Sequence, residues 1–170
     1  MLHDLADTDL TFDPQPLLRL LNKHEVEFIV IGGVAVMAYG CLRATRDIDI
    51  VPKPTRSNFV KLAKALEELE AKLIGVDAHL LDDVDLDAPT LARGANFPVE
   101  TIYGQLDILQ ETHDINLYEL VSKEPVHVTM DGVSVYVCSL SVLRKLKQLA
   151  ARPRDLADLD ELEEVTEETT

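Results

Sequence analysis

The feature that most constrains the fold is a short apolar segment, residues 46–51, that carries two aspartates. Charged and apolar residues alternate along it, which is the period of a β-strand. Asp47 and Asp49 therefore share one face of the strand, and Ile48 and Ile50 share the other. Two carboxylates this close repel one another and are costly to bury, so a cation between them is the simplest compensation. Hard oxygen ligands of this kind suit Mg²⁺, with Mn²⁺ as an alternative.

The Asp-x-Asp spacing alone has little weight, because it occurs five times in the chain. Four of these pairs lie in surroundings where solvated loop or helix surface explains them, at positions 7/9, 83/85, 85/87 and 158/160. Only the pair at 47/49 is embedded in an apolar strand. It is therefore the candidate metal site.

A glycine pair precedes this strand, at a point where a strand is expected to lead into a helix. Residues 28–31 are apolar and largely β-branched, which predicts a buried strand, and residues 34–39 predict a short helix that ends at Gly40. Between them, Gly32 and Gly33 would let the backbone approach an anion such as a triphosphate at the helix N-terminus. The alternative is a tight turn that binds nothing. The chain has no GxxxxGK[ST] motif and so no P-loop.

A third acidic residue, Asp107, lies within an apolar segment, residues 101–110, that predicts another strand. Three carboxylates gathered at one edge would complete a two-metal site of the kind that clamps the attacking and leaving oxygens in phosphoryl transfer. The alternative is an acidic residue on an edge strand that faces water.

The remaining elements follow from periodicity and from breaker residues. Residues 57–73 predict an amphipathic helix with Ser57 as N-cap, and Asp131-Gly132 predicts the turn of a hairpin. The other expected segments are a helix over 14–24, a loop over most of 77–98, hairpin strands at 126–130 and 133–137, and helices at 141–150 and 155–165 separated by Pro153. Together they predict an α/β (α+β) fold, with a mixed sheet of about five strands and helices mainly on one face. We expect one domain over residues 1–170, with a frayed acidic end from about residue 163.

The charge balance limits the partners that the chain can bind. Its net charge is -15, and residues 155–170 hold eight acidic and no basic residues, about half of the excess. Extended nucleic-acid binding needs clustered Lys and Arg and is not expected, although a local contact with tRNA stays open. The longest uncharged run, residues 28–42, is too short to span a membrane, and the acidic N-terminus is unlike a signal peptide. We expect a cytoplasmic protein in which Cys41 and Cys138 are reduced.

Two motifs resemble a known family. Gly32-Gly33, thirteen residues and then Asp47-Ile-Asp49 resemble the hG[G/S]…DxD signature of the DNA polymerase β-like nucleotidyltransferase superfamily. The run from Lys147 to Asp158, KQLAARPRDLAD, is similar to the K-x4-[K/R]-x-K-D-x-x-D motif of the AbiEii/AbiGii abortive-infection toxins within that superfamily. The resemblance implies a nucleotidyltransferase-like fold. It also implies transfer of an NMP group from an NTP to an acceptor (RNA, protein or small molecule), with release of pyrophosphate, in a toxin–antitoxin or phage-defence system.

The resemblance also implies roles for individual residues. Asp47 and Asp49 would hold the metal, with Asp107 as third ligand or general base. Asp155 and Asp158 would orient the cationic residues or assist the acceptor, so Asp155 is counted with the catalytic carboxylates. Contacts to the nucleotide would come from Gly32, Gly33, Lys147 and Arg152.

Three polar residues directly before the metal strand, Arg43, Thr45 and Arg46, are candidates for binding nucleotide or acceptor, or else they balance the nearby acids. A second reading of the whole chain also stays open. The short C-terminal part and its acidic end would suit a non-catalytic protein of this fold that binds a cognate toxin or antitoxin.

Overall fold

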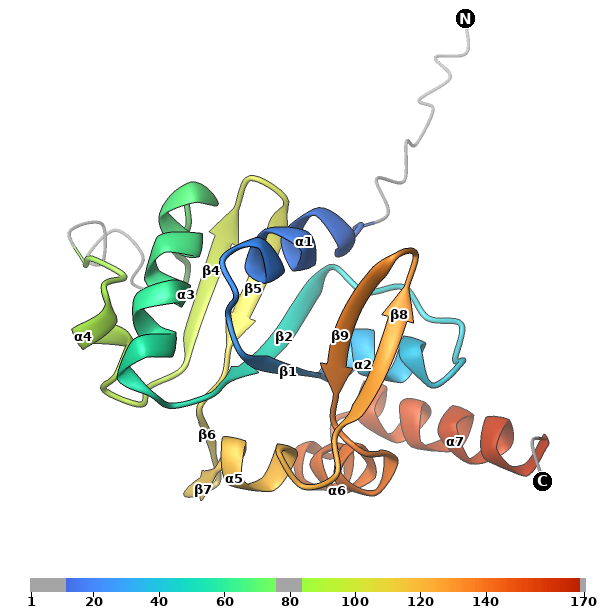
Figure 1. Cartoon of the computed structure of the whole chain (residues 1–170). Coiled ribbons are helices and arrows are strands. Elements are labelled where there is room, and N and C mark those ends of the chain that lie inside the picture. Colours follow the sequence, from blue (N-terminus) through green and yellow to red (C-terminus); the bar gives the residue numbers. More distant parts are fainter. Residues whose placement is uncertain (1–11, 76–83, 169–170) are drawn as a thin grey trace, which may run out of the picture.

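A seven-stranded mixed β-sheet forms the centre of the computed structural model, which describes residues 12–75 and 84–168 (Figure 1). The strand order is β3-β4-β5-β2-β1-β9-β8. These strands are β1 (Phe28–Ile31), β2 (Asp47–Pro52), β3 (Lys72–Leu73), β4 (Phe97–Thr101), β5 (Gly104–Ile108), β8 (Val126–Met130) and β9 (Val133–Val137). Two further strands, β6 (Glu111–Thr112) and β7 (Ile115–Asn116), pair with each other in a separate ribbon.

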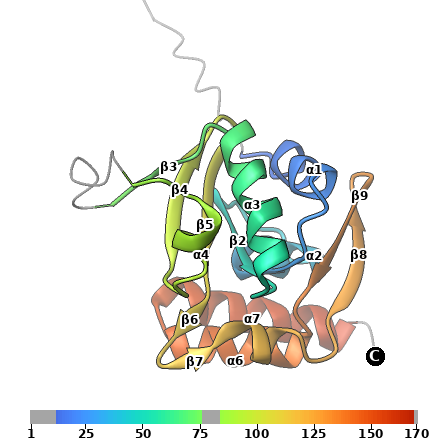
Figure 2. The same ribbon diagram turned by 60° about the vertical axis from the view of Figure 1, so that its left-hand side comes forward.

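Helices surround this sheet unevenly. Two of them, α1 and α3, lie together on one face, whereas α6 and α7 lie side by side at the end of the sheet where β5 leads into β6 (Figures 1 and 2). The helices are α1 (Gln15–Lys23), α2 (Gly32–Ala38), α3 (Arg56–Glu68), α4 (Ala88–Leu91), α5 (Leu117–Val121), α6 (Leu140–Ala150) and α7 (Pro153–Glu168). Throughout the described ranges, every helix is too short or too polar to cross a membrane.

The central strand β2 has one neighbour of each orientation. It pairs antiparallel with β1, where Ile31 is opposite Asp49, and parallel with β5, where Asp49 is opposite Asp107. Because adjacent strands lie about 4.8 Å apart, this register brings acidic residues from distant parts of the chain next to each other. The position of the site therefore follows from strand pairing.

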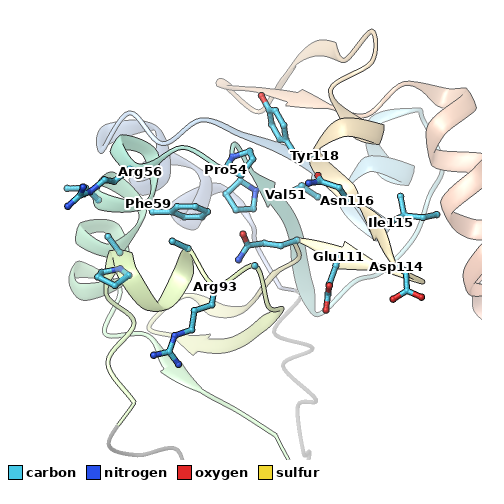
Figure 3. A pocket seen from close by; sticks show the side chains of 17 residues that line it. Val51, Pro54, Arg56, Phe59, Arg93, Glu111, Asp114, Ile115, Asn116 and Tyr118 are labelled. Atoms are coloured by element: carbon cyan, nitrogen blue, oxygen red, sulfur yellow. The ribbon is translucent and has the colours of Figure 1, made fainter.

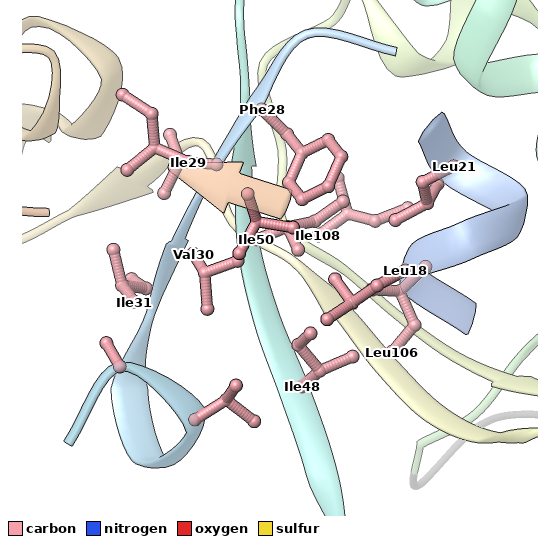
Figure 4. Packing of buried hydrophobic residues seen from close by; sticks show 14 of the residues in the cluster. Leu18, Leu21, Phe28, Ile29, Val30, Ile31, Ile48, Ile50, Leu106 and Ile108 are labelled. Atoms are coloured by element: carbon pink, nitrogen blue, oxygen red, sulfur yellow. The ribbon is translucent and has the colours of Figure 1, made fainter. Parts of the chain in front are cut away.

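The buried face of the central strands explains why the acids lie on the other one. Ile48 and Ile50 are fully buried, and so are Leu106 and Ile108 on the neighbouring β5. Figure 4 shows these side chains together with Leu18 and Leu21 of α1 in the core. Period-two alternation then turns the aspartates of both strands to the opposite, half-buried face.

The mixed sheet and most of the predicted elements are confirmed, but the sheet is larger than expected. It has seven strands instead of about five. The strand predicted over 101–110 is confirmed as β5 but is shorter, since the end of β4 and a turn through Ile102 and Tyr103 occupy its first residues. β4 begins within 77–98, which was expected to be mainly loop, and α4 also lies there. Residues 76–83 are outside the described residues.

Helix boundaries differ in physically clear ways. The side chain of Thr55, not that of Ser57, accepts the N-capping hydrogen bond of α3, from the Asn58 amide. This helix stops at Glu68 instead of continuing to residue 73, and Glu70 adopts a left-handed conformation (φ 52°) that ends it. The last helix, α7, begins at Pro153 and continues to Glu168, two residues earlier and three residues later than expected. Residues 169–170 lie outside the described residues.

Candidate active site

Three aspartates from two adjacent strands share one face of the sheet. Asp47 and Asp49 are two residues apart on β2, and Asp107 on β5 is paired in register with Asp49. All three side chains are half-buried. The structure thus brings together the residues that the sequence predicted as the acidic centre.

Neighbouring polar side chains orient two of these carboxylates. The Thr45 hydroxyl is within hydrogen-bonding distance of the carbonyl oxygen and Oδ1 of Asp47, at 3.0 and 3.1 Å. The Gln105 amide donates to Oδ1 of Asp107 at 2.9 Å. Each of these two contacts involves Oδ1 of the carboxylate.

Asp49 is the electrostatic centre of the group. Burial first, and then the charges of Asp47 and Asp107, raise the pKa of Asp49 to about 7, against the opposing effect of Lys147 and Arg152. The pKa of Asp107 is also raised, by burial first and then by Asp47, while the Gln105 hydrogen bond opposes the shift. These carboxylates therefore lie in a region with too little positive charge.

The glycine pair makes room for the acidic strand and for the loop before it. Gly32 has φ 68°, a left-handed conformation that favours glycine, and a Cβ placed on it would collide with the carboxylate of Asp49. A Cβ on Gly33 would come within 3.1 Å of Thr45 Oγ1 and 3.2 Å of Arg43 Nη1. Both glycines thus allow close packing around the aspartates.

The chemistry of this donor set fits a hard divalent cation, since it consists of carboxylate oxygens that lack compensating charge. The side chains do not yet form a finished coordination site: across residues 12–75 and 84–168, no group of three or more His, Cys, Asp or Glu side chains is placed to hold a metal ion. The fold thus positions the three carboxylates on one face of the sheet.

A buried network of ion pairs lies beside the acids, where α6 meets α7. The Lys147 ammonium is 3.1 Å from Oδ1 of Asp155 and 2.8 Å from Oδ2 of Asp158. The Arg152 guanidinium pairs with Asp155 at 2.8 Å, and that of Arg43 pairs with Asp158 at 2.5 Å. Although burial raises the pKa of Asp155, hydrogen bonds from Arg152 and Lys147 outweigh it and hold the pKa at about 2.

A cavity of about 190 Å³ connects this network to the acidic strand. Polar residues from both ends of the chain line it, together with apolar residues of α5 and α6. Among them are Gly32, Asp49, Lys147, Arg152, Asp155, Leu117, Leu143 and Leu146. Five residues predicted from the sequence as site residues are therefore brought to one cavity.

The other predicted site residues have different surroundings. Asp47 and Asp107 flank Asp49 on the sheet, Thr45 is buried against Asp47, and Arg46 is exposed. Sequence reasoning missed Gln105 as the partner of Asp107. The signal was present, because residues two apart on a strand share a face.

A larger hollow of about 940 Å³ lies at the C-terminal end of β2 (Figure 3). Its walls include Val51 and Phe59, and Arg93 lies on one side of it with Asp114 on the other. Glu111 lines both this hollow and the smaller cavity, so the two adjoin at β6.

Solved structures of other proteins share the fold of this chain, although their sequences differ widely from it. No family model and no curated protein matches the sequence. The antibiotic-resistance factor ANT(2'')-Ia superposes with a TM-score of 0.60 and 14% identity, over 92% of this chain and 83% of that chain. The same protein in complex with adenylyl-2''-tobramycin gives 0.58 and 15%, over 94% of each chain. Lincomycin-bound LnuA, a lincosamide antibiotic adenylyltransferase, gives 0.56 and 17%, over 89% of this chain and 94% of that chain. The chain therefore has the nucleotidyltransferase fold.

Proposed function

We propose that this protein is a Mg²⁺-dependent nucleotidyltransferase that moves an NMP group from an NTP to an acceptor hydroxyl. The observation that carries the proposal is the group of three aspartates on one face of two adjacent strands. Gly32, whose left-handed backbone favours glycine, packs against one of them. The nucleotidyltransferase fold supports it. In the reaction, the acceptor oxygen bonds to the α-phosphorus while the bond from that phosphorus to the pyrophosphate oxygen breaks.

The residues have distinct parts in this proposal. Asp47, Asp49 and Asp107 would hold Mg²⁺, which, when bound, supplies positive charge to the phosphates and to the attacking oxygen. Asp107 would also take the acceptor proton, and its raised pKa supports that role as a base. Lys147 and Arg152 would neutralise phosphate charge from the cavity side, which is the main demand of phosphoryl-type transfer.

We propose a small molecule as the acceptor. The larger hollow, about 940 Å³, has the size of a small-molecule site, and it adjoins the smaller cavity at Glu111. The net charge of -15 disfavours a polyanionic acceptor such as RNA. Two solved structures with the same fold also hold small molecules, lincomycin in one and adenylyl-2''-tobramycin in the other.

The test is incubation with each of the four labelled NTPs, Mg²⁺ or Mn²⁺, and a panel of hydroxylated small molecules, with release of pyrophosphate as readout. Asp47→Asn or Asp107→Asn should lower the rate by roughly a thousandfold. Asp85→Asn, an exposed acidic residue outside the site, is the matched control. Failure of the wild-type protein to bind any metal–nucleotide complex would refute the proposal.

A place among the AbiEii/AbiGii-type toxins is supported by the C-terminal motif, whose Lys147, Arg152, Asp155 and Asp158 form a single ion-pair network. Growth arrest on expression, relieved by a cognate antitoxin, is the expected behaviour. If an Asp47→Ala, Asp49→Ala double variant keeps that effect in full, the protein acts without catalysis, as a binding partner.

A further inference from the structure

We propose that Arg43 is a positioning residue, which acts through Asp158 to hold the Lys147 ammonium at the cavity that contains Asp49. The proposal rests on the proposed function, since it assigns Lys147 to the phosphates. It differs from the simpler idea that Arg43 itself binds the nucleotide.

The first observation is that two cations share one carboxylate oxygen. Oδ2 of Asp158 is 2.5 Å from Nη1 of Arg43 and 2.8 Å from Nζ of Lys147. The exposed fractions of these three side chains are 6%, 11% and 7%. Contacts this well shielded from water hold their geometry, because breaking one leaves a buried charge without its partner.

The second observation is how the charges are arranged around Lys147. Its ammonium lies between Asp155 and Asp158, which are three residues apart on α7, and each of these carboxylates also pairs with an arginine. Arg152 on Asp155 is 72% exposed, so a ligand can reach it. The buried Arg43 instead contacts the same oxygen of Asp158 as Lys147 does, so the negative charge of that carboxylate is shared between the two cations.

The third observation concerns the path of Arg43. A Cβ added to Gly33 would lie 3.2 Å from Nη1 and 3.3 Å from Cζ of Arg43, so the guanidinium lies against the first turn of α2. It is thereby enclosed between that turn and α7. Thr45, two residues further on, contacts Asp47. Arg43 thus connects the loop before β2, which contacts Asp47, to α7, whose Asp158 contacts Lys147.

The experiment is a double-mutant cycle with Arg43→Gln, Asp158→Asn and their combination, read out by equilibrium affinity for Mg²⁺–NTP and by KM and kcat. Each single variant should lose about tenfold in nucleotide affinity, with KM affected more than kcat. The affinity of the double variant should be no lower than that of the single variant that binds nucleotide less tightly. Arg43→Lys should recover most of the loss. Lys145→Gln, an exposed cation on α6, is the control.

A second readout needs no nucleotide: acetylation of the Lys147 amine by acetic anhydride, followed by mass spectrometry. Arg43→Gln should raise labelling of Lys147 several-fold, and Lys145→Gln should not. Unchanged labelling together with additive losses of affinity would overturn the proposal and make Arg43 a direct ligand contact. If the wild-type protein binds no nucleotide, the proposed function fails alone, and the labelling result still decides the role of Arg43. Should Arg43→Gln not fold, Asp158→Asn, which breaks the same contact, supplies the comparison, and Arg43→Lys remains the rescue variant.

Discussion

The carboxyl group of Asp49 shows how a single residue can oppose folding in order to serve a site. Its pKa of about 7 follows from burial and from the charges of Asp47 and Asp107. The pKa of an aspartate in an unfolded chain is about 3.9. Between these values the folded protein keeps a proton that the unfolded chain releases, so the free energy of unfolding falls as the pH rises from about 4 to 7.

We therefore predict that Asp49→Asn stabilises the protein at pH 8, by roughly 2 kcal/mol after allowance for partial exposure, and has little effect at pH 4. The same change should abolish transfer activity. Urea unfolding at both pH values measures the stability difference. Asp85→Asn, which is exposed, should show none. Equal stability of wild type and Asp49→Asn at pH 8 would contradict the shifted pKa.

Gly32 permits a second prediction at the scale of one residue. Its positive φ and the contact with Asp49 mean that Gly32→Ala adds both backbone strain and a collision. We expect a loss of about 3 kcal/mol in unfolding free energy. Gly94 also has a positive φ (82°), but nothing lies within 4 Å of its added Cβ. Gly94→Ala therefore isolates the backbone cost, about 1 kcal/mol. If both variants lose the same amount, the contact with Asp49 does not matter.

At the scale of elements, Asp155 of α7 forms one of the two ion pairs that connect α7 to Lys147 of α6. The pKa of Asp155, held at about 2, lies below its value in the unfolded chain. Its contribution to stability is therefore complete above about pH 4 and is lost as the pH falls toward 2. Asp155→Asn should cost about 3 kcal/mol at pH 7, because it leaves Lys147 without one partner in a buried network.

The check is thermal or urea unfolding of wild type and Asp155→Asn from pH 7 to pH 2. The gap between the two proteins should close as the medium becomes more acidic. Asp160→Asn, an exposed acid on the same helix, provides the baseline. A gap that stays constant down to pH 2 would show that the ion pairs are not the source of the effect.

Elements with strong local signals were predictable, and those defined by pairing were not. The hairpin of β8 and β9 and the acid-bearing β2 follow from alternation and turn residues. β4 was missed because Pro98 interrupts its pattern and acidic, proline-containing sequence precedes it. The pairing of Arg43 with Asp158 joins residues 115 positions apart, and no local pattern could indicate it.

For the whole molecule, binding of substrate should be visible as stability. A ligand that binds only the folded state at 100 times its Kd adds about 2.7 kcal/mol, which for a chain of this size raises Tm by about 5–10 °C. We predict this rise for NTP with Mg²⁺, its loss on addition of EDTA, and a much smaller rise for Asp47→Asn. An equal rise for NTP in EDTA would show that nucleotide binds without metal.

The central place of β2 in the sheet has a consequence for how the molecule fluctuates. Hydrogen-bonded neighbours flank β2 on both sides, so its amides exchange with solvent only when the sheet itself comes apart. The two-residue strands β6 and β7, beside the larger hollow, have no such protection. Brief local openings can thus reshape the rim of this hollow while the spacing of the aspartates persists.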